Sequence, residues 1–279
     1  MTNVIIIRGG GDLGSGVALR LHRTGMRVII TELPQPLVVR RLVSFADAIY
    51  QGKALVEEVE GLKVDRPSQI REVLAAGKIP VMVDPDCRIL FDLDQIQPDL
   101  IPSVLVDARM LKRAPELDMH ATSLVIGLGP GFIAGKNCHA VIETNRGFHL
   151  GRVIWEGSAS ANTGVPEGFG GAYLERVLRS PGQGIFQPLR KICDLVESGD
   201  LIAEVDGLPI RAQFKGVLRG LLYPGLFVHP GTKVGDLDPR CDPSYCTQVS
   251  DKSLAVGGAV LEAILSRKDL RRGFWEEVT

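Results

Sequence analysis

Glycines near the N-terminus are spaced so that they could hold a phosphate group. The apolar run Val4–Ile7 is followed by Gly9, Gly11 and Gly14 in the pattern G-x-G-x-x-G. In this pattern the first glycine permits a tight turn, the second lets a phosphate approach the backbone, and the third lets the next helix press on the strand. The amides and the positive dipole end of that helix then face an anion. The predicted pyrophosphate-binding residues are Gly9, Gly10, Gly11, Asp12, Leu13 and Gly14.

An acidic residue follows at about the spacing found in dinucleotide sites. Glu32 comes just after a second apolar run, Met26–Ile30. Its carboxylate could accept hydrogen bonds from a ribose diol, and it would repel a 2′-phosphate. The pattern therefore favours a dinucleotide ligand, either NAD or the nucleotide part of a pterin dinucleotide. The alternative is a glycine turn of an α/β protein with no ligand.

Other acidic and basic side chains could carry catalysis. Asp84 and Asp107 each end an expected buried strand, where they could orient a substrate or, alternatively, cap the next helix. Glu143 and His149 could move protons as a pair, because a carboxylate tunes a histidine that titrates near neutrality. A polar hairpin without catalysis is the alternative for that pair. The candidate catalytic residues are His149, Glu143 and Asp107.

The sequence does not decide the roles of two further residue pairs. Cys241 and Cys246 are too few for a recognisable metal site, even if His229 supplied a third ligand, so we predict no metal. They could instead provide a thiolate for group transfer, or simply pack. The pair Arg40 and Arg41 could hold a phosphate or form a solvated helix face.

Composition excludes several classes of partner. The net charge of −1 and the 5% aromatic content give no basis for nucleic-acid binding. No apolar run approaches the roughly 18 residues that span a bilayer. The N-terminus lacks a secretion signal, and the five cysteines do not form a disulfide framework. We therefore expect a cytoplasmic protein without a membrane partner.

The pattern along the chain predicts an α/β fold. Residues 1–125 alternate strands with helices, among them Ser15–Thr24 and Leu37–Ala48, as in a Rossmann-like doubly wound sheet. A glycine-rich middle segment follows over residues 126–183. Residues 184–279 predict a β-rich domain, a small barrel or sandwich, and the helix Ser250–Ser266 is expected to close it.

Several runs of sequence resemble a known protein family, the accessory proteins of the selenium-dependent molybdenum hydroxylase system (YqeB-like). The resemblance implies a cytoplasmic protein with an N-terminal Rossmann-like domain that serves the maturation of molybdenum hydroxylases, with such a hydroxylase as its partner. It carries no catalytic residue assignment, and the chain departs from the family pattern at Arg109. The matching runs are Arg8–Asp12, Arg40–Phe45, Ile126–Gly135, His139–Gly147, His149–Ile154, Asn162–Gly164, Gly216–Gly220, Lys233–Arg240, Ser250–Lys252 and Gly257–Ile264.

A weaker similarity links the C-terminal half to biotinyl- or lipoyl-type barrels. The segments Val196–Ala203 and Gly216–Val228 look like the two halves of such a barrel. Carrier domains of this type place a modifiable lysine at a hairpin tip. The corresponding tip, Asp206–Pro209, has no lysine, so we expect a structural or docking barrel.

Taken together, the motifs and the resemblance predict an accessory protein. It would bind a dinucleotide and help to modify or load the molybdenum cofactor of a selenium-dependent hydroxylase. One alternative is an NAD-dependent oxidoreductase acting on a small metabolite. Another is a non-catalytic scaffold that docks the hydroxylase.

Overall fold

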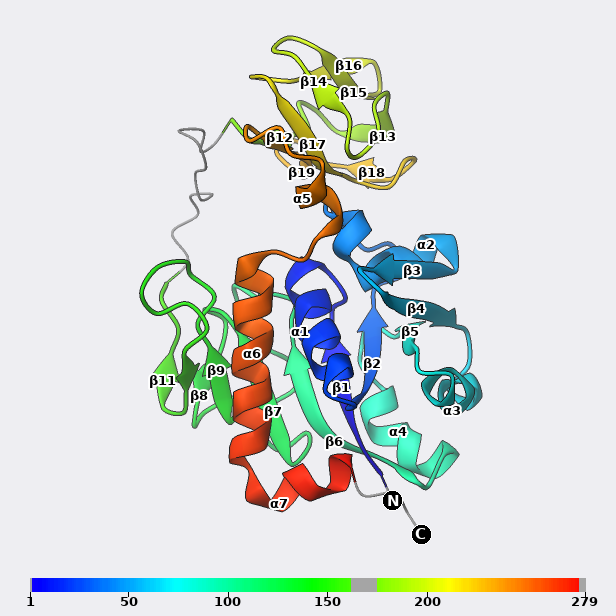
Figure 1. The fold of residues 1–279 in the computed structure, drawn as a ribbon, viewed down its shortest axis with the longest axis vertical. Coiled ribbons are helices and arrows are strands. Elements are labelled where there is room, and N and C mark those ends of the chain that lie inside the picture. Colours follow the sequence, from blue (N-terminus) through cyan, green and yellow to red (C-terminus); the bar gives the residue numbers. More distant parts are fainter. Residues whose placement is uncertain (1, 162–174, 276–279) are drawn as a thin grey trace.

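A large mixed sheet forms the body of the protein in the computed structural model, which describes residues 2–161 and 175–275 (Figure 1). Its nine strands are β1 (Thr2–Arg8), β2 (Arg27–Glu32), β3 (Lys53–Val56), β4 (Val59–Val64), β5 (Ile79–Val83), β6 (Leu100–Asp107), β7 (Leu124–Leu128), β9 (Ala140–Ile142) and β10 (Val153–Ile154). Their order is β10-β9-β7-β6-β1-β2-β5-β4-β3. The strands from β9 to β4 run parallel, while β10 and β3 pair antiparallel at the two edges.

Helices cover both faces of this sheet because β1 alternates its apolar side chains between them. Ile5 and Ile7 pack in one core with α1 (Asp12–Arg23) and α6 (Asp251–Ser266). Val4 and Ile6 pack in the other with α3 (Ile70–Ala75) and α4 (Ile89–Ile96). The central strands are therefore buried on both sides, as their continuous apolar runs predict.

Helices α1 and α6 lie side by side through small residues (Figure 1). An ideal Cβ on Gly16 would lie 2.6 Å from Cβ of Ser253, and one on Gly257 would lie 2.8 Å from the Gly16 carbonyl oxygen. Helix α6 begins as its sequence predicts, with Ser250 as N-cap accepting from the Ser253 amide at 3.1 Å. The absence of a side chain at Gly16 and Gly257 thus allows the two helices to approach closely.

A β domain lies above the body in Figure 1, with the short helix α5 (Ser244–Thr247) at the junction. It has its own apolar core, which includes the fully buried Phe186 and Leu218. The hairpin tip at Asp206 and Gly207 has positive φ angles at both positions, as two-residue hairpin turns with Asp-Gly commonly do. Its two four-stranded sheets are built from β12 (Val177–Arg179), β13 (Gly184–Pro188), β14 (Leu195–Val196), β15 (Leu201–Val205), β16 (Leu208–Arg211), β17 (Gly216–Leu221), β18 (Phe227–Val228) and β19 (Lys233–Asp238).

The predicted Rossmann-like doubly wound sheet is wrong. Such a sheet needs a helix in each crossover, but β6, β7 and β9 follow one another without one. The small β8 (Ile133–Ala134) and β11 (Gly157–Ser158) form a separate hairpin in this region. The face of the sheet that such crossover helices would cover is covered by α6, which lies near the other end of the chain. The sheet also continues beyond residue 125, into the glycine-rich middle segment, which contributes β9 and β10.

Two helix predictions also need correction. The segment Leu37–Ala48 forms only the short turns η1 (Arg41–Val43) and η2 (Phe45–Asp47) before α2 (Ala48–Gln51), because the side chains of Arg40 and Arg41 bond to distant parts of the chain. Helix α6 packs on α1 rather than closing the β domain. Residues 162–174, including the Asn162–Gly164 motif and part of the predicted glycine-rich middle segment, lie outside the described residues.

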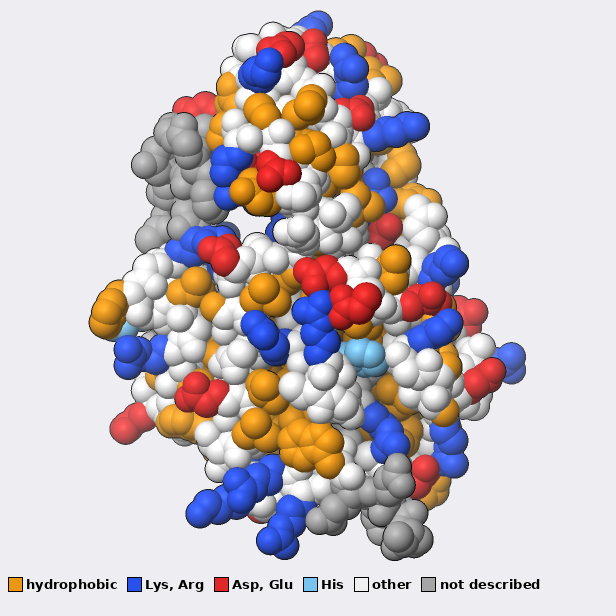
Figure 2. Space-filling view, in the orientation of Figure 1, with side chains coloured by type: hydrophobic (Ala, Val, Ile, Leu, Met, Phe, Trp, Pro, Cys, Tyr) orange, Lys and Arg blue, Asp and Glu red, His pale blue; other side chains and the backbone are white. Residues whose placement is uncertain are grey.

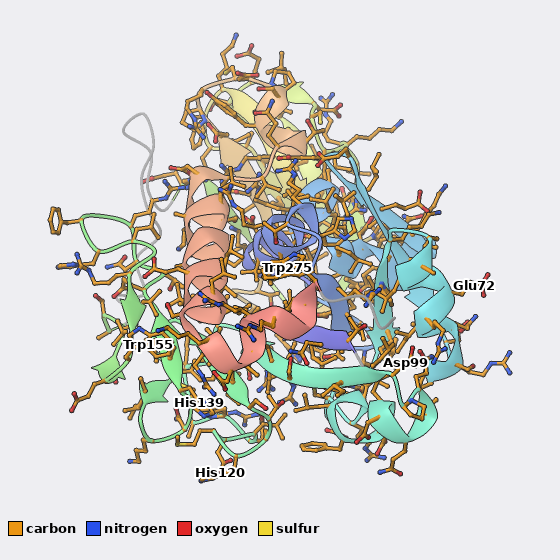
Figure 3. The ribbon with its side chains drawn as sticks, turned by 60° about the horizontal axis from the view of Figure 1, so that its bottom comes forward. Glu72, Asp99, His120, His139, Trp155 and Trp275 are labelled. Carbon is orange, nitrogen blue, oxygen red and sulfur yellow. The ribbon has the colours of Figure 1, made fainter. Side chains whose placement is uncertain are left out.

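The last described residues return to the first helix. After α7 (Lys268–Arg271) and η4 (Arg272–Phe274), the indole Nε1 of Trp275 donates to the Thr24 carbonyl at 2.8 Å (Figure 3). The C-terminal segment therefore covers the end of α1 opposite the β domain. Over residues 2–161 and 175–275, no helix has both the length and the apolar character to cross a membrane.

The α1–α6 contact gives a stability prediction. We expect Gly16→Ala to lower the free energy of unfolding by about 1–3 kcal/mol, because the added methyl group overlaps Ser253. Gly258→Ala in the same helix pair is the control: its Cβ meets nothing within 4 Å, so helix propensity should stabilise the protein slightly. Urea unfolding of both variants measures the difference. Equal stability would contradict the proposed packing.

Candidate functional site

A cleft separates the body from the β domain, at the N-terminus of α1. It consists of two adjoining cavities of about 620 and 440 Å³, both lined by Gly11, Leu37 and Val38. Figure 2 shows the molecule hollowed between the two parts, with Lys and Arg side chains at the margin of the hollow. The glycine turn after β1 thus lies at the centre of the cleft.

The larger cavity has a strongly positive lining in a chain whose net charge is −1. Its acidic lining residues are Asp12 and Asp236, and its cationic ones come from both the body and the β domain. A cleft lined by one sign of charge concentrates ions of the opposite sign. The lining cations are Arg40, Arg146, Arg176, Arg219, Lys233 and Lys252.

On the body side of the cleft, Arg40 links several segments. Its guanidinium donates to Asp12 Oδ2 at 2.9 Å and to the carbonyls of Tyr245 and Gln248 at 3.0 and 3.1 Å. Ser253 Oγ donates to the other oxygen of Asp12 at 2.8 Å. Arg40 is only 7% exposed, so this pair is neither the solvated face nor the free phosphate contact that the sequence left open. Asp12 itself supplies the negative charge that the α1 dipole attracts.

On the β-domain side of the cleft, a buried carboxylate forms ion pairs with two arginines. Asp236 on β19 accepts from Arg219 at 2.6 Å and from Arg176 at 3.2 Å. Burial by itself raises the pKa of Asp236, but Lys233 and the two arginines hold that pKa below its ordinary value. Asp236 therefore stays ionised, and it fixes two guanidinium groups in the wall of the cleft. On the same strand, Asp238 pairs with Arg240 at 2.6 Å.

The predicted cofactor-binding residues divide into two groups. Gly9, Gly11 and Glu32 line the smaller cavity, and Gly11 lines the larger one together with Asp12 and Leu13. A Cβ on Gly11 would meet nothing within 4 Å, so this position is open to the cleft. The remaining two glycines are packed behind it: a Cβ would meet Ile30 at Gly10 and would overlap the Gly9 carbonyl at Gly14.

Glu32 is bound by the glycine turn itself. Its Oε1 accepts from the Gly10 amide at 3.2 Å and its Oε2 from the Leu33 amide at 3.1 Å. Burial raises the pKa of Glu32, although these two hydrogen bonds act to lower it. Each carboxylate oxygen thus has one backbone partner, and the role of Glu32 on a ribose stays a prediction.

The two aspartates at strand ends are also engaged. Asp107 is 1% exposed and accepts from Arg109 Nε at 2.9 Å and from its terminal nitrogen at 2.6 Å. Asp84 accepts the amides of Arg88 and Ile89 at 3.0 and 2.9 Å at the start of α4, so capping is its role in the structure. Asp107 lines neither cavity and is held in a bidentate ion pair with Arg109, which lines the smaller one.

Glu143 and His149 are not brought together as an acid–base pair. Glu143 is buried and accepts the amides of Asn145 and Ser160, both at 2.7 Å. These hydrogen bonds lower the pKa of Glu143 in spite of burial. His149 is exposed and its ring packs edge-on against Phe148. The catalytic roles predicted for both residues remain predictions, without a shared geometry.

No histidine lines either cavity of the cleft, within the residues that the structure describes. Figure 3 shows His120 and His139 on the side of the body that faces away from the β domain. There, Nδ1 of His139 accepts the Val125 amide at 3.0 Å. Acid–base chemistry in the cleft would therefore depend on carboxylates and lysines.

The cysteine pair is not a site in the structure. Cys246 is buried with its thiol against the Leu218 carbonyl at 3.6 Å, and burial raises its pKa to about 12, which disfavours a thiolate. Cys241 lies elsewhere, with its thiol donating to the Pro239 carbonyl at 3.4 Å. Among the described residues, no group of three or more His, Cys, Asp or Glu could hold a metal ion.

Sequence reasoning missed the cleft residues of the β domain: Arg176, Arg219 and Lys233. Two features of the sequence could have revealed them. An arginine lies in the middle of the apolar strand Gly216–Leu221, and the strand Lys233–Asp238 carries aspartates at alternate positions. A charged side chain in such a strand needs a partner. The sequence could not show that this partner network faces the N-terminus of α1.

Comparison with known proteins finds a relative that is similar in sequence over most of this chain. The chain is 45% identical over 262 residues, 94% of its length, to the "Uncharacterized protein YqeB" of Escherichia coli. The chain spans about half the length of this curated relative, 47%. No family model matches the chain.

Solved structures show weaker likenesses. An aspartoacylase family protein from Mesorhizobium loti is 16% identical over 85% of this chain and 84% of that chain, with a TM-score of 0.27. The ectoine utilization protein EutE (DoeB) from Ruegeria pomeroyi is 12% identical over 84% and 86%, with a TM-score of 0.25. A succinylglutamate desuccinylase from Silicibacter sp. is 13% identical over 85% and 84%, with a TM-score of 0.24.

These findings correct the functional expectations. Two of the named structures carry titles of aspartoacylase or succinylglutamate desuccinylase proteins. The predicted dinucleotide-binding molybdenum accessory protein, NAD-dependent oxidoreductase and hydroxylase scaffold find no support among the named structures. In the structure, Glu32 accepts two backbone amides and Asp12 lies in the first turn of α1.

The raised pKa of Glu32 predicts a pH dependence of stability. Between its ordinary value and the raised value, the folded state binds more protons than the unfolded state, so stability falls as pH rises through that window. Glu32→Gln lacks this group, and we expect the wild type to gain stability relative to the variant as pH is lowered from 7 toward 4.5. Urea unfolding of both proteins at several pH values measures this. Parallel pH profiles would contradict it.

Proposed function

We propose that the cleft between the sheet and the β domain binds a small, multiply charged anion that carries phosphate or carboxylate groups. The observation that carries this proposal is the excess of cations around the larger cavity, six against two carboxylates. Both carboxylates are already paired, Asp12 with Arg40 and Asp236 with Arg219 and Arg176. Arg146 is also paired, with Asp251, so four of the six lining cations are held in place by ion pairs.

The shape of the cleft supports a small ligand. The larger cavity, about 620 Å³, falls in the range of small-molecule sites. Its walls come from two separate cores, and each wall is held by buried hydrogen bonds rather than by exposed side chains. Such a lining is preorganised, so binding costs little ordering of side chains.

Gly11 provides the test of this function. Because its Cβ would enter open space, we expect Gly11→Val to fold normally and to reduce the affinity for pyrophosphate at least tenfold by filling the centre of the cleft. Isothermal titration calorimetry with pyrophosphate and with citrate, each at low and moderate salt, measures the affinities. Binding should weaken with salt because the attraction is electrostatic.

Gly258→Ala is the matched control, since this glycine is equally open but lies in α6, away from the lining. It should bind both anions like the wild type. A wild type that binds neither anion, or a Gly11→Val variant that binds them unchanged, would refute the assignment of this cleft.

A further inference from the structure

Lys233 has an unusual position among the cations of the cleft. It is the first residue of β19, and its exposed side chain lines the larger cavity. No hydrogen bond or ion pair holds its ammonium group, as far as residues 2–161 and 175–275 are concerned. Its neighbour Arg219 on β17, in contrast, is fixed by Asp236 and Asp238 at 2.6 and 3.2 Å. Lys233 is thus free to reach a ligand.

The charges around Lys233 disfavour its protonated form. Desolvation by the cleft walls acts first, and the guanidinium groups of Arg176 and Arg219 add to it. Asp236 and Asp12 oppose these effects, but the pKa of Lys233 is lowered overall.

An amine whose pKa is lowered is a better nucleophile near neutral pH than that of an ordinary lysine, and Lys233 lies in the same cavity lining as the guanidinium groups of Arg176 and Arg219. Lysines activated by desolvation and by a cationic neighbour form imines with carbonyl compounds. The lining of the larger cavity offers no cysteine or histidine for this role, among the described residues. Its one serine, Ser250, is already hydrogen-bonded as the N-cap of α6.

We propose that Lys233 is the reactive group of this cleft and forms an imine with a small aldehyde or ketone that carries phosphate or carboxylate groups. This inference rests on the proposed function, since the anionic group would be held by the arginines. The Nζ lone pair attacks the carbonyl carbon, and a C–N bond forms. The C–O bond then breaks, and the oxygen leaves as water with two protons from Nζ. No oxidant or reductant is required.

Pyridoxal 5′-phosphate is a suitable probe, because it combines an aldehyde with a phosphate. The full chain would be incubated with it at neutral pH, reduced with sodium cyanoborohydride and mapped by peptide mass spectrometry. We expect Lys233 to be labelled at least tenfold faster than Lys53, which is also the exposed first residue of a strand. Excess pyrophosphate should slow the labelling of Lys233 and leave Lys53 unchanged.

Two variants and a second reagent separate the possible outcomes. Lys233→Gln should lose the fast labelling and Lys53→Gln should retain it, while both keep the wild-type circular dichroism. Acetic anhydride, which needs no anion site, should modify Lys233 with a midpoint at lower pH than Lys53. Even labelling of the two lysines by both reagents overturns the inference.

The failure of the proposed function would look different. If pyrophosphate binds in the cleft but Lys233 forms no adduct with the aldehyde, anion binding stands and the imine inference is overturned. In a second outcome, pyrophosphate does not bind, but acetic anhydride still modifies Lys233 rapidly and with a midpoint at lower pH than Lys53. The proposal of anion binding then fails. The reactive amine is then supported alone, and the inferred class of substrate is overturned.

Discussion

One buried ion pair fixes the geometry on which the cleft depends. Arg40 and Asp12 join the loop after β2 to the first turn of α1, and the same guanidinium donates to the carbonyls of Tyr245 in α5 and of Gln248 just after it. The arginine side chain of this pair is 7% exposed and the aspartate side chain 33%. Ser253 of α6 donates to the second oxygen of Asp12. Four segments that are distant in sequence are therefore held at one point, directly below the β domain.

Local patterns in the sequence predicted much of the body. The strand Thr2–Arg8, the helix that follows it and the close approach at Gly14 all follow from an apolar run and a glycine turn. Helix α6 was equally visible from Ser250 and its apolar stripe. These features depend on residues that are neighbours along the chain, so their physics can be read without knowing the rest of the fold.

Predictions that depended on distant contacts failed. The segment around Arg40 was expected to be helical, but bonds from Arg40 and Arg41 to the β-domain side override its weak propensity. For the predicted ribose ligand Glu32, the spacing could not show the two hydrogen bonds that its carboxylate accepts from the Gly10 and Leu33 amides. A spacing pattern gives the residue types of a site, but it does not reveal which groups are already paired.

In the sequence, the β domain lies between the strands of the large sheet and helix α6, which covers one face of that sheet. During synthesis, Ile5, Ile7 and their neighbours on that face leave the ribosome long before Val256 and Val260 of α6. A nascent chain that ends within the β domain therefore exposes an apolar sheet surface, the kind of surface that chaperones bind. The core of the body is completed only when α6 emerges, after the β domain. The core and the cleft are therefore completed at the same late stage of synthesis.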